Sequence, residues 1–199
     1  MFKYLISILL SPKSTWDNVA KMPKDSAELG LIYTIILAII PAAAFFYGTT
    51  QVGWTVGDGE TIKLTTASAG RMIPLFYLAQ ICAVAGIGWF IHWMSDTYGA
   101  DSSLTKGIRI AGLTATPLFI SGAIGVWPEL IVNFMVGVTA VSWSTYLLYI
   151  GIPRVMHIPE ERGFLFSSAI VAVCLVAIVV ILGASVILWD MGAAPAFTD

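Results

Sequence analysis

Charged side chains are scarce in this sequence. They make up 11% of its 199 residues, while 58% are hydrophobic and the mean hydropathy is +0.87. A soluble domain carries roughly 25% charged residues, which cover its water-facing surface. The shortage excludes an ordinary soluble domain and places the chain in the membrane class. Because the net charge of −2 shows no basic excess, we expect no nucleic-acid partner.

Cysteine is also scarce. Cys82 and Cys174 are the two in the chain, and both lie inside apolar runs. A disulfide framework needs thiols in the loops of a small secreted chain, which is not the pattern here. We therefore interpret both cysteines as small buried hydrophobic residues.

The residue patterns of catalysis are missing as well. The sequence has no nucleophile-elbow glycine pattern, no paired-histidine zinc motif and no evident acid/base pair. His92 stands between Trp89 and Trp93, as in an aromatic belt at the headgroups, and His157 stands alone. A site made of the two histidines is the open alternative. We expect no enzyme, no cofactor and no bound metal.

Long apolar runs are present in number. A membrane-spanning helix needs roughly 20 apolar residues, and five segments meet this length. They are residues 29–47, 72–94, 108–127, 130–150 and 167–189. The sequence therefore predicts an all-α polytopic membrane protein, a bundle of five transmembrane helices.

The distribution of lysine and arginine predicts the orientation. On a five-span threading, eight of the ten basic residues fall on one face, and Lys63 and Arg71 fall on the other. The eight are Lys3, Lys13, Lys21, Lys24, Lys106, Arg109, Arg154 and Arg162. We expect a cytoplasmic N-terminus, a C-terminus outside, and a short extracytoplasmic tail at 190–199.

The segment 1–28 precedes the first span. Its sequence predicts two short interfacial helices that break at Ser11 and Pro12, with the Ser11 side chain capping the second. Trp16 and Val19 share one face of that helix, and the lysines can reach anionic headgroups. A flexible tail is the alternative.

The glycine-rich stretch QVGWTVGDGETIKLT covers residues 51–65. A phosphate-binding loop requires G-x-x-x-x-G-K-[ST], and here Lys63 comes too late and is not followed by Ser or Thr. Trp54 and Val56 alternate with polar residues before the turn, as do Ile62 and Leu64 after it. This pattern around Asp-Gly predicts a small extracytoplasmic hairpin or loop, with Trp54 at the headgroups and no nucleotide bound.

The middle of each predicted span lacks Asp, Glu, Lys and Arg. Ion-coupled transporters usually place an ionisable group at that depth. The candidate intramembrane polar residues are Gln80, Thr114, Thr116 and Asn133. They serve either helix packing, at about 0.6 kcal/mol per hydrogen bond, or a solute path. Pro41 and Pro117 are candidate helix kinks, because each removes a backbone hydrogen bond.

The most polar stretch on the predicted cytoplasmic side is GIPRVMHIPEERGF, residues 151–164. Pro153 is expected to end the fourth span. The candidate docking loop consists of Arg154, His157, Glu160, Glu161 and Arg162. A solvated connector is the alternative. Apolar Val155, Met156 and Ile158 lie among these charges, which favours contact with a cytoplasmic partner.

Several stretches resemble one known family: SPKSTW, FFYGTTQVGWTVGDG, ATPLFISG, YLLYIGIP and EERGFLFSS. They are similar to the Yip-domain family of five-span membrane proteins, named for interaction with Ypt/Rab GTPases, and most of all to its bacterial inner-membrane branch. The resemblance implies a five-helix membrane domain over 29–189 with its N-terminus in the cytoplasm. It also implies a location in the bacterial inner membrane.

We therefore expect a non-enzymatic protein that organises the membrane or binds another membrane protein. Its expected partners are the lipid bilayer and either a second copy or another membrane protein. The alternative is a transporter or channel for a small neutral or lipidic solute, with Gln80, Thr114, Thr116 and Asn133 along its path.

Overall fold

A computed structural model describes residues 2–23, 30–55 and 59–198. Lys24, Leu29, Val56, Gly57 and Asp58, which entered the predictions above, lie outside these ranges. The named elements are α1 (Phe2–Leu10), α2 (Pro12–Ala20), α3 (Leu31–Leu37), α4 (Ile39–Tyr47), β1 (Trp54–Thr55), β2 (Thr61–Ile62), α5 (Thr66–Met94), α6 (Leu104–Thr114), α7 (Thr116–Ser121), α8 (Leu130–Met156) and α9 (Glu160–Leu188). Short 3₁₀ or π turns extend α4, α5, α7 and α9.

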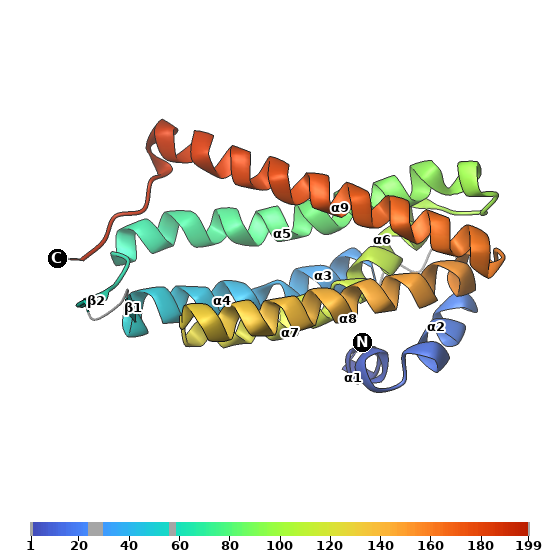
Figure 1. The fold of residues 1–199 in the computed structure, drawn as a ribbon, viewed down its shortest axis with the longest axis horizontal. Helices are drawn as coiled ribbons and strands as arrows, with labels where there is room; N and C mark the ends of the chain where they lie inside the picture. The colour runs from blue at the N-terminus through green and yellow to red at the C-terminus, as the bar shows by residue number, and fades with distance from the viewer. Residues whose placement is uncertain (1, 24–29, 56–58, 199) are drawn as a thin grey trace.

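The fold is an elongated helical bundle, as Figure 1 shows. Within the described ranges, four helical stretches are long and apolar enough to cross a membrane, and a fifth results if the bent pair α6 and α7 counts as one span. The four are Leu31–Val52, Thr66–Tyr98, Leu130–Met156 and Glu160–Gly192. The expected all-α polytopic membrane protein is confirmed. Its orientation across the membrane stays a prediction.

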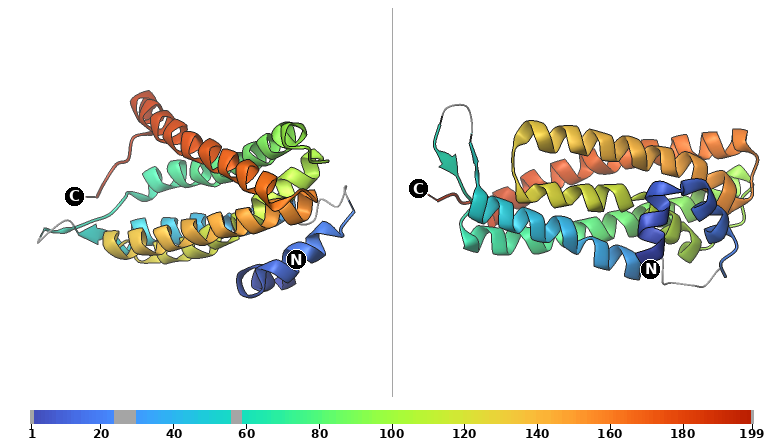
Figure 2. Two further views of the ribbon diagram at one scale, coloured as in Figure 1. Left: turned by 45° about the vertical axis from the view of Figure 1, so that its right-hand side comes forward. Right: turned by 90° about the horizontal axis from the view of Figure 1, so that it is seen from below.

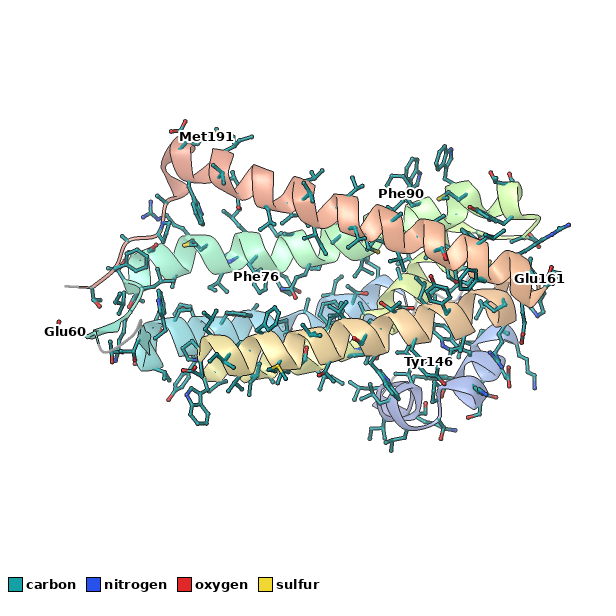
Figure 3. All side chains as sticks on the ribbon, viewed as in Figure 1. Glu60, Phe76, Phe90, Tyr146, Glu161 and Met191 are labelled. Carbon is teal, nitrogen blue, oxygen red and sulfur yellow. The ribbon has the colours of Figure 1, made fainter. Side chains whose placement is uncertain are left out.

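The two ends of the bundle differ. Glu161 lies at one end and Glu60 and Met191 lie at the other (Figure 3). We call the first the α2 end and the second the hairpin end. Figures 1 and 2 show that α9 diverges from α8 towards the hairpin end.

The predicted hairpin is present. Strands β1 and β2 pair antiparallel, with Trp54 opposite Ile62 and Thr55 opposite Thr61. The chain after α9 returns to this hairpin, since the N–H of Thr65 donates to the carbonyl of Ala196 over 2.9 Å. The Trp54 ring also meets the Phe197 ring edge-on, with 5.8 Å between centroids.

Both candidate kink prolines lie in the first turns of helical segments that follow a break. The first span breaks at Ala38, and Pro41 comes early in α4. The third span bends by 40° at Ala115, and Pro117 follows at the start of α7. A proline is tolerated there because the N–H that it lacks has no partner in a first turn. A Cβ atom on Gly122 would lie 2.5 Å from Cβ of Pro41, so the two broken spans touch closely.

Two expectations about single residues were wrong. Pro153 does not end the fourth span, because α8 continues to Met156 and closes at His157, whose φ of 53° is left-handed. One missing N–H is tolerated there because Pro153 packs on α9, where a Cβ on Gly163 would lie 2.6 Å from Cβ of Pro153. Cys82 is exposed at the protein surface rather than buried, since its side of α5 faces away from the other helices.

Candidate functional site

The N-terminal helices form a pair that is broken at Ser11. The N–H of Ser11 donates to the Ser7 carbonyl over 2.8 Å, so Ser11 still belongs to the end of α1. The predicted cap by its side chain is wrong, because ψ at Ser11 is 61° and not the extended value that a capping residue adopts. The Ser11 carbonyl accepts the Thr15 hydroxyl instead, over 2.9 Å.

One face of α2 packs against α8. Trp16 and Val19 share that face, as predicted, and both are buried. A Cβ atom on Gly151 would lie 2.6 Å from Cε2 of Trp16, so the indole ring fits where glycine leaves room on α8. The face therefore rests on protein and not on lipid. The interfacial location of this helix pair stays a prediction, and the Trp16 and Val19 face of α2 is covered by a complementary surface inside the chain.

Two further contacts hold this pair in place. Nε of Arg154 lies 3.5 Å from Oδ1 of Asp17, an exposed ion pair of a kind that contributes about 0–1 kcal/mol. Nη2 of Arg109 donates to the Pro23 carbonyl over 2.9 Å. Arg109 is only 1% exposed, although the sequence indicated merely a basic residue at the edge of a loop. The position of Arg109 between the apolar residues Ile108 and Ile110 is the feature of the sequence that could have indicated its burial.

Helix α1 runs across the long helices, as Figures 1 and 2 agree. Its side chains divide into two sets. Ile8 is fully buried and Leu5 and Leu9 pack against the core, whereas Ile6 is 58% exposed and Leu10 is 78% exposed. The helix thus has apolar side chains both towards the protein and away from it.

The four candidate polar residues of the spans lie in four different settings. The Thr116 hydroxyl and the Tyr33 hydroxyl are 2.8 Å apart, which links α7 to α3. Nε2 of Gln80 donates to the carbonyl of Phe76 on its own helix over 3.3 Å. Nδ2 of Asn133 donates to the Trp127 carbonyl over 2.7 Å, at the start of α8.

Thr114 alone of these four lines a cavity of about 170 Å³ at mid-length between α5, α6, α8 and α9. Ser144 and Cys174 line it too. The hydroxyl oxygens of Thr114 and Ser144 are buried and make no hydrogen bond among the described atoms. The sequence indicated Thr114 as a candidate but not that Thr114 and Ser144 line one cavity, because that depends on how α6 meets α8.

The candidate docking loop is shorter than expected, and its apolar residues are buried although its charged residues 160–162 are exposed. Three residues, 157–159, separate α8 from α9. The side chains of Val155, Met156 and Ile158 are all buried, so they offer no apolar surface to a partner. The loop prediction overlooked that both helices extend towards each other.

The charged members of that loop have separate places. Arg154 contacts α2 as described, and His157 closes α8. Glu160 and Glu161 occupy the first turn of α9, where carboxylates complement the positive helix end. Nη1 of Arg162 approaches Gly99, since a Cβ there would lie 2.9 Å from it.

The described residues contain no group of three or more His, Cys, Asp or Glu side chains placed to hold a metal ion. His92 lies on α5 and His157 at the end of α8. Nδ1 of His92 is buried and makes no hydrogen bond among the described atoms.

Comparison with known proteins places the chain in a family. The chain is 38% identical over 160 residues to the inner membrane protein YohC of Escherichia coli strain K12, which covers 80% of this chain and 82% of that protein. The same values hold for YohC of E. coli O6:H1 strain CFT073. No solved structure matches. The Yip1 domain family matches residues 6–181. With its membrane-spanning helices, the chain is a multi-pass inner-membrane protein, and it belongs to the Yip1 domain family.

Proposed function

We propose that this protein is not an enzyme and that it organises the inner membrane through its N-terminal helix pair. The observation that carries the proposal is the placement of α1. This helix crosses the long axis of the bundle (Figure 2) and exposes Ile6 and Leu10, while Ile8 anchors its other side in the core. A helix lying in the plane of the membrane adds apolar volume to one leaflet only.

The contacts of α2 support the same proposal. Three contacts hold the pair α1 and α2 against the spans. They are Trp16 with Gly151, Asp17 with Arg154, and Arg109 with the Pro23 carbonyl. The depth of an isolated amphipathic helix in the interface depends on its own side chains. The depth of this helix pair is instead set by the contact of α2 with α8. A protein with α1 held in this way would insert the same apolar volume into one leaflet wherever it lies in the membrane. We call this inserted volume, formed by α1, the wedge.

The orientation belongs to this proposal. The bias of lysine and arginine supports an α2 end in the cytoplasm and a hairpin end outside. A topology reporter fused behind Asp199 should be accessible from outside only. Access from the cytosol alone would reverse the leaflet in which α1 lies.

Vesicle reconstitution tests the wedge. The wild-type chain should reduce the mean vesicle diameter in electron cryomicroscopy as the protein-to-lipid ratio rises. The double variant Ile6→Ser and Leu10→Ser should abolish that reduction. The matched control is Leu130→Ser with Ile131→Ser, two apolar positions on α8 at the hairpin end that are at least as exposed on average as Ile6 and Leu10. The proposal would be refuted if both double variants lost the reduction in vesicle diameter equally, or if the wild type did not change the diameter.

A second candidate function is the binding of another membrane protein. A groove of about 310 Å³ lies between α5 and α9, lined by Phe76, Ala79 and Ile181 among others. A transmembrane helix of a partner fits such an apolar groove. A photo-crosslinker at Ile181 should then give one defined adduct in native membranes, and a crosslinker at Phe134 on α8 should not. The transport alternative lacks comparable support, because its four path residues have separate surroundings.

A further inference from the structure

A polar cleft lies between α1 and α2. Its volume is about 610 Å³. The lining side chains used below are Lys3, Tyr4, Ser7, Ser14, Asn18 and Lys21. The cavity and the groove described above are lined mainly by apolar side chains, so this cleft differs from them in chemistry.

The cleft is positively charged. Lys3 comes from α1 and Lys21 directly follows α2, and both are exposed. None of the described lining residues is acidic. Asp17 is the acidic residue of α2, and its carboxylate is engaged with Arg154 instead. Two ammonium groups therefore act on this cleft without a neutralising carboxylate in its described wall.

The lining can also donate hydrogen bonds. The Ser14 hydroxyl donates to the Ser11 carbonyl over 3.1 Å, and the Ser7 hydroxyl donates to the Tyr4 carbonyl over 3.4 Å. Both bonds are local, and the Ser14 bond is exposed, so exchanging it for a bond to an anion costs little. The Asn18 amide is a third donor group on the same wall.

An apolar groove begins beside the same helix. Leu9 of α1 lines it together with Pro117, Met135 and Trp143 of α7 and α8, and its volume is about 460 Å³. A helix is about 10 Å across, so the cleft and the groove are separated by less than the length of a lipid. A polar, cationic cleft near an apolar groove is the pattern that an amphiphile with an anionic head fits.

We infer that the cleft binds the phosphate headgroup of an anionic phospholipid, with an acyl chain along the groove beside Leu9. Lys3 and Lys21 would hold the phosphate oxygens by charge, and Ser14 and Asn18 would donate hydrogen bonds to them. The inference deepens the proposed function, because it relies on α1 lying at the membrane surface. It names the lipid class that would gather around the wedge.

Native mass spectrometry of the purified full chain in detergent tests the inference. Phosphatidylglycerol and phosphatidylcholine with the same acyl chains are the two probes. Two lysines at a headgroup predict a preference for phosphatidylglycerol of about tenfold or more. A wild type that binds both lipids equally would overturn the inference.

Lysine variants separate the cleft from general surface charge. Lys3→Gln and Lys21→Gln should each reduce the preference about fivefold. Lys13→Gln is the matched control, because Lys13 is an exposed lysine of α2 that does not line the cleft, and it should change the preference less than twofold. Equal losses in all three variants would point to non-specific attraction and overturn the inference. Thermal unfolding without added lipid shows that each variant is folded.

Two further arms identify the source of the phosphate and separate this inference from the wedge. Inorganic phosphate at millimolar concentration should not displace phosphatidylglycerol, and efficient displacement would mean a site for free phosphate and would contradict lipid binding. The variant Ile6→Ser with Leu10→Ser should keep the lipid preference, since neither residue lines the cleft. Vesicle diameter and lipid preference are thus separate readouts, and either can fail alone.

Discussion

Both halves of α9 are rich in apolar residues, and their surroundings differ. In the first half, Gly163, Phe166, Ser167 and Ile170 are buried, and Tyr98 stacks on Phe166 with ring centroids 4.7 Å apart. None of the described side chains of α9 beyond Ile170 is buried. The mean hydropathy is 3.2 in the most apolar window of this span, which begins with the charged residues 160–162. Hydropathy therefore predicts contact with the membrane, and it does not say whether lipid or protein provides that contact.

Glycine placement explains the difference. A Cβ atom on Gly163 would collide with Pro153, and a Cβ atom on Gly151 would collide with Trp16. Gly183, in the second half of α9, has no atom within 4 Å of where its Cβ would lie. In lipid, close helix packing depends on small residues at the contact. The α2 end uses its glycines in this way, and the outer half of α9 does not.

The largest expected effect comes from removing the side chain that fills the α2 end. Trp16→Ala should lower the free energy of unfolding by about 3 kcal/mol or more, because it leaves a cavity over Gly151. Trp189→Ala, at the open end of α9, should cost less than about 1 kcal/mol, since that ring is half-exposed. Denaturant unfolding in detergent measures both values. If the two variants lowered the free energy of unfolding by comparable amounts, the two ends of the bundle would be equally well packed.

An intermediate effect is expected from adding volume. Gly163→Leu should destabilise the protein by about 1–3 kcal/mol through overpacking against Pro153. Gly183→Leu should be neutral or slightly stabilising, because the added side chain meets open space and glycine is a poor helix former. Thermal unfolding compares the two. If Gly183→Leu is as harmful as Gly163→Leu, then something absent from the monomer covers the outer half of α9.

The smallest effect concerns hydroxyl groups. The Tyr149 hydroxyl and the Ser168 hydroxyl are 2.8 Å apart and link α8 to the first half of α9. Tyr149→Phe should cost about 0.6 kcal/mol, the typical value for such a bond in a membrane protein. Ser185→Ala should cost nearly nothing, because the Ser185 hydroxyl bonds only to its own helix, at the Leu182 carbonyl. A larger loss for Ser185→Ala would contradict this contrast in unfolding experiments.

Much of the fold follows from local patterns. The apolar runs predict the helices that can span a membrane, since each helix satisfies its own backbone and needs no partner to do so. The alternation of apolar and polar residues on either side of Asp-Gly predicts a hairpin or loop, and β1 and β2 form a hairpin there. The break at Ser11 and Pro12 is likewise visible in the sequence.

The remaining features depend on contacts between distant residues. The burial of Arg109 and of the α2 face requires segments more than 80 residues apart to meet, as Arg109 meets Pro23. The same is true of Thr116 and Tyr33. Single-residue chemistry identified Thr116 as a candidate for either helix packing or a solute path, but it could not name the partner. Val155 and Met156 were misjudged because a charged neighbourhood in the sequence does not specify which face of α8 they occupy.

The returning tail gives α9 a second attachment. Leu64 bridges Phe197, and the N–H of Thr198 donates to the Lys63 carbonyl over 2.9 Å. Helix α9 is therefore held at both ends, by its packed first half and by the tail that follows it, although few of its residues in between pack on protein. Proteolysis between Trp189 and Ala196 would leave it fastened at one extremity only, free to swing into the lipid.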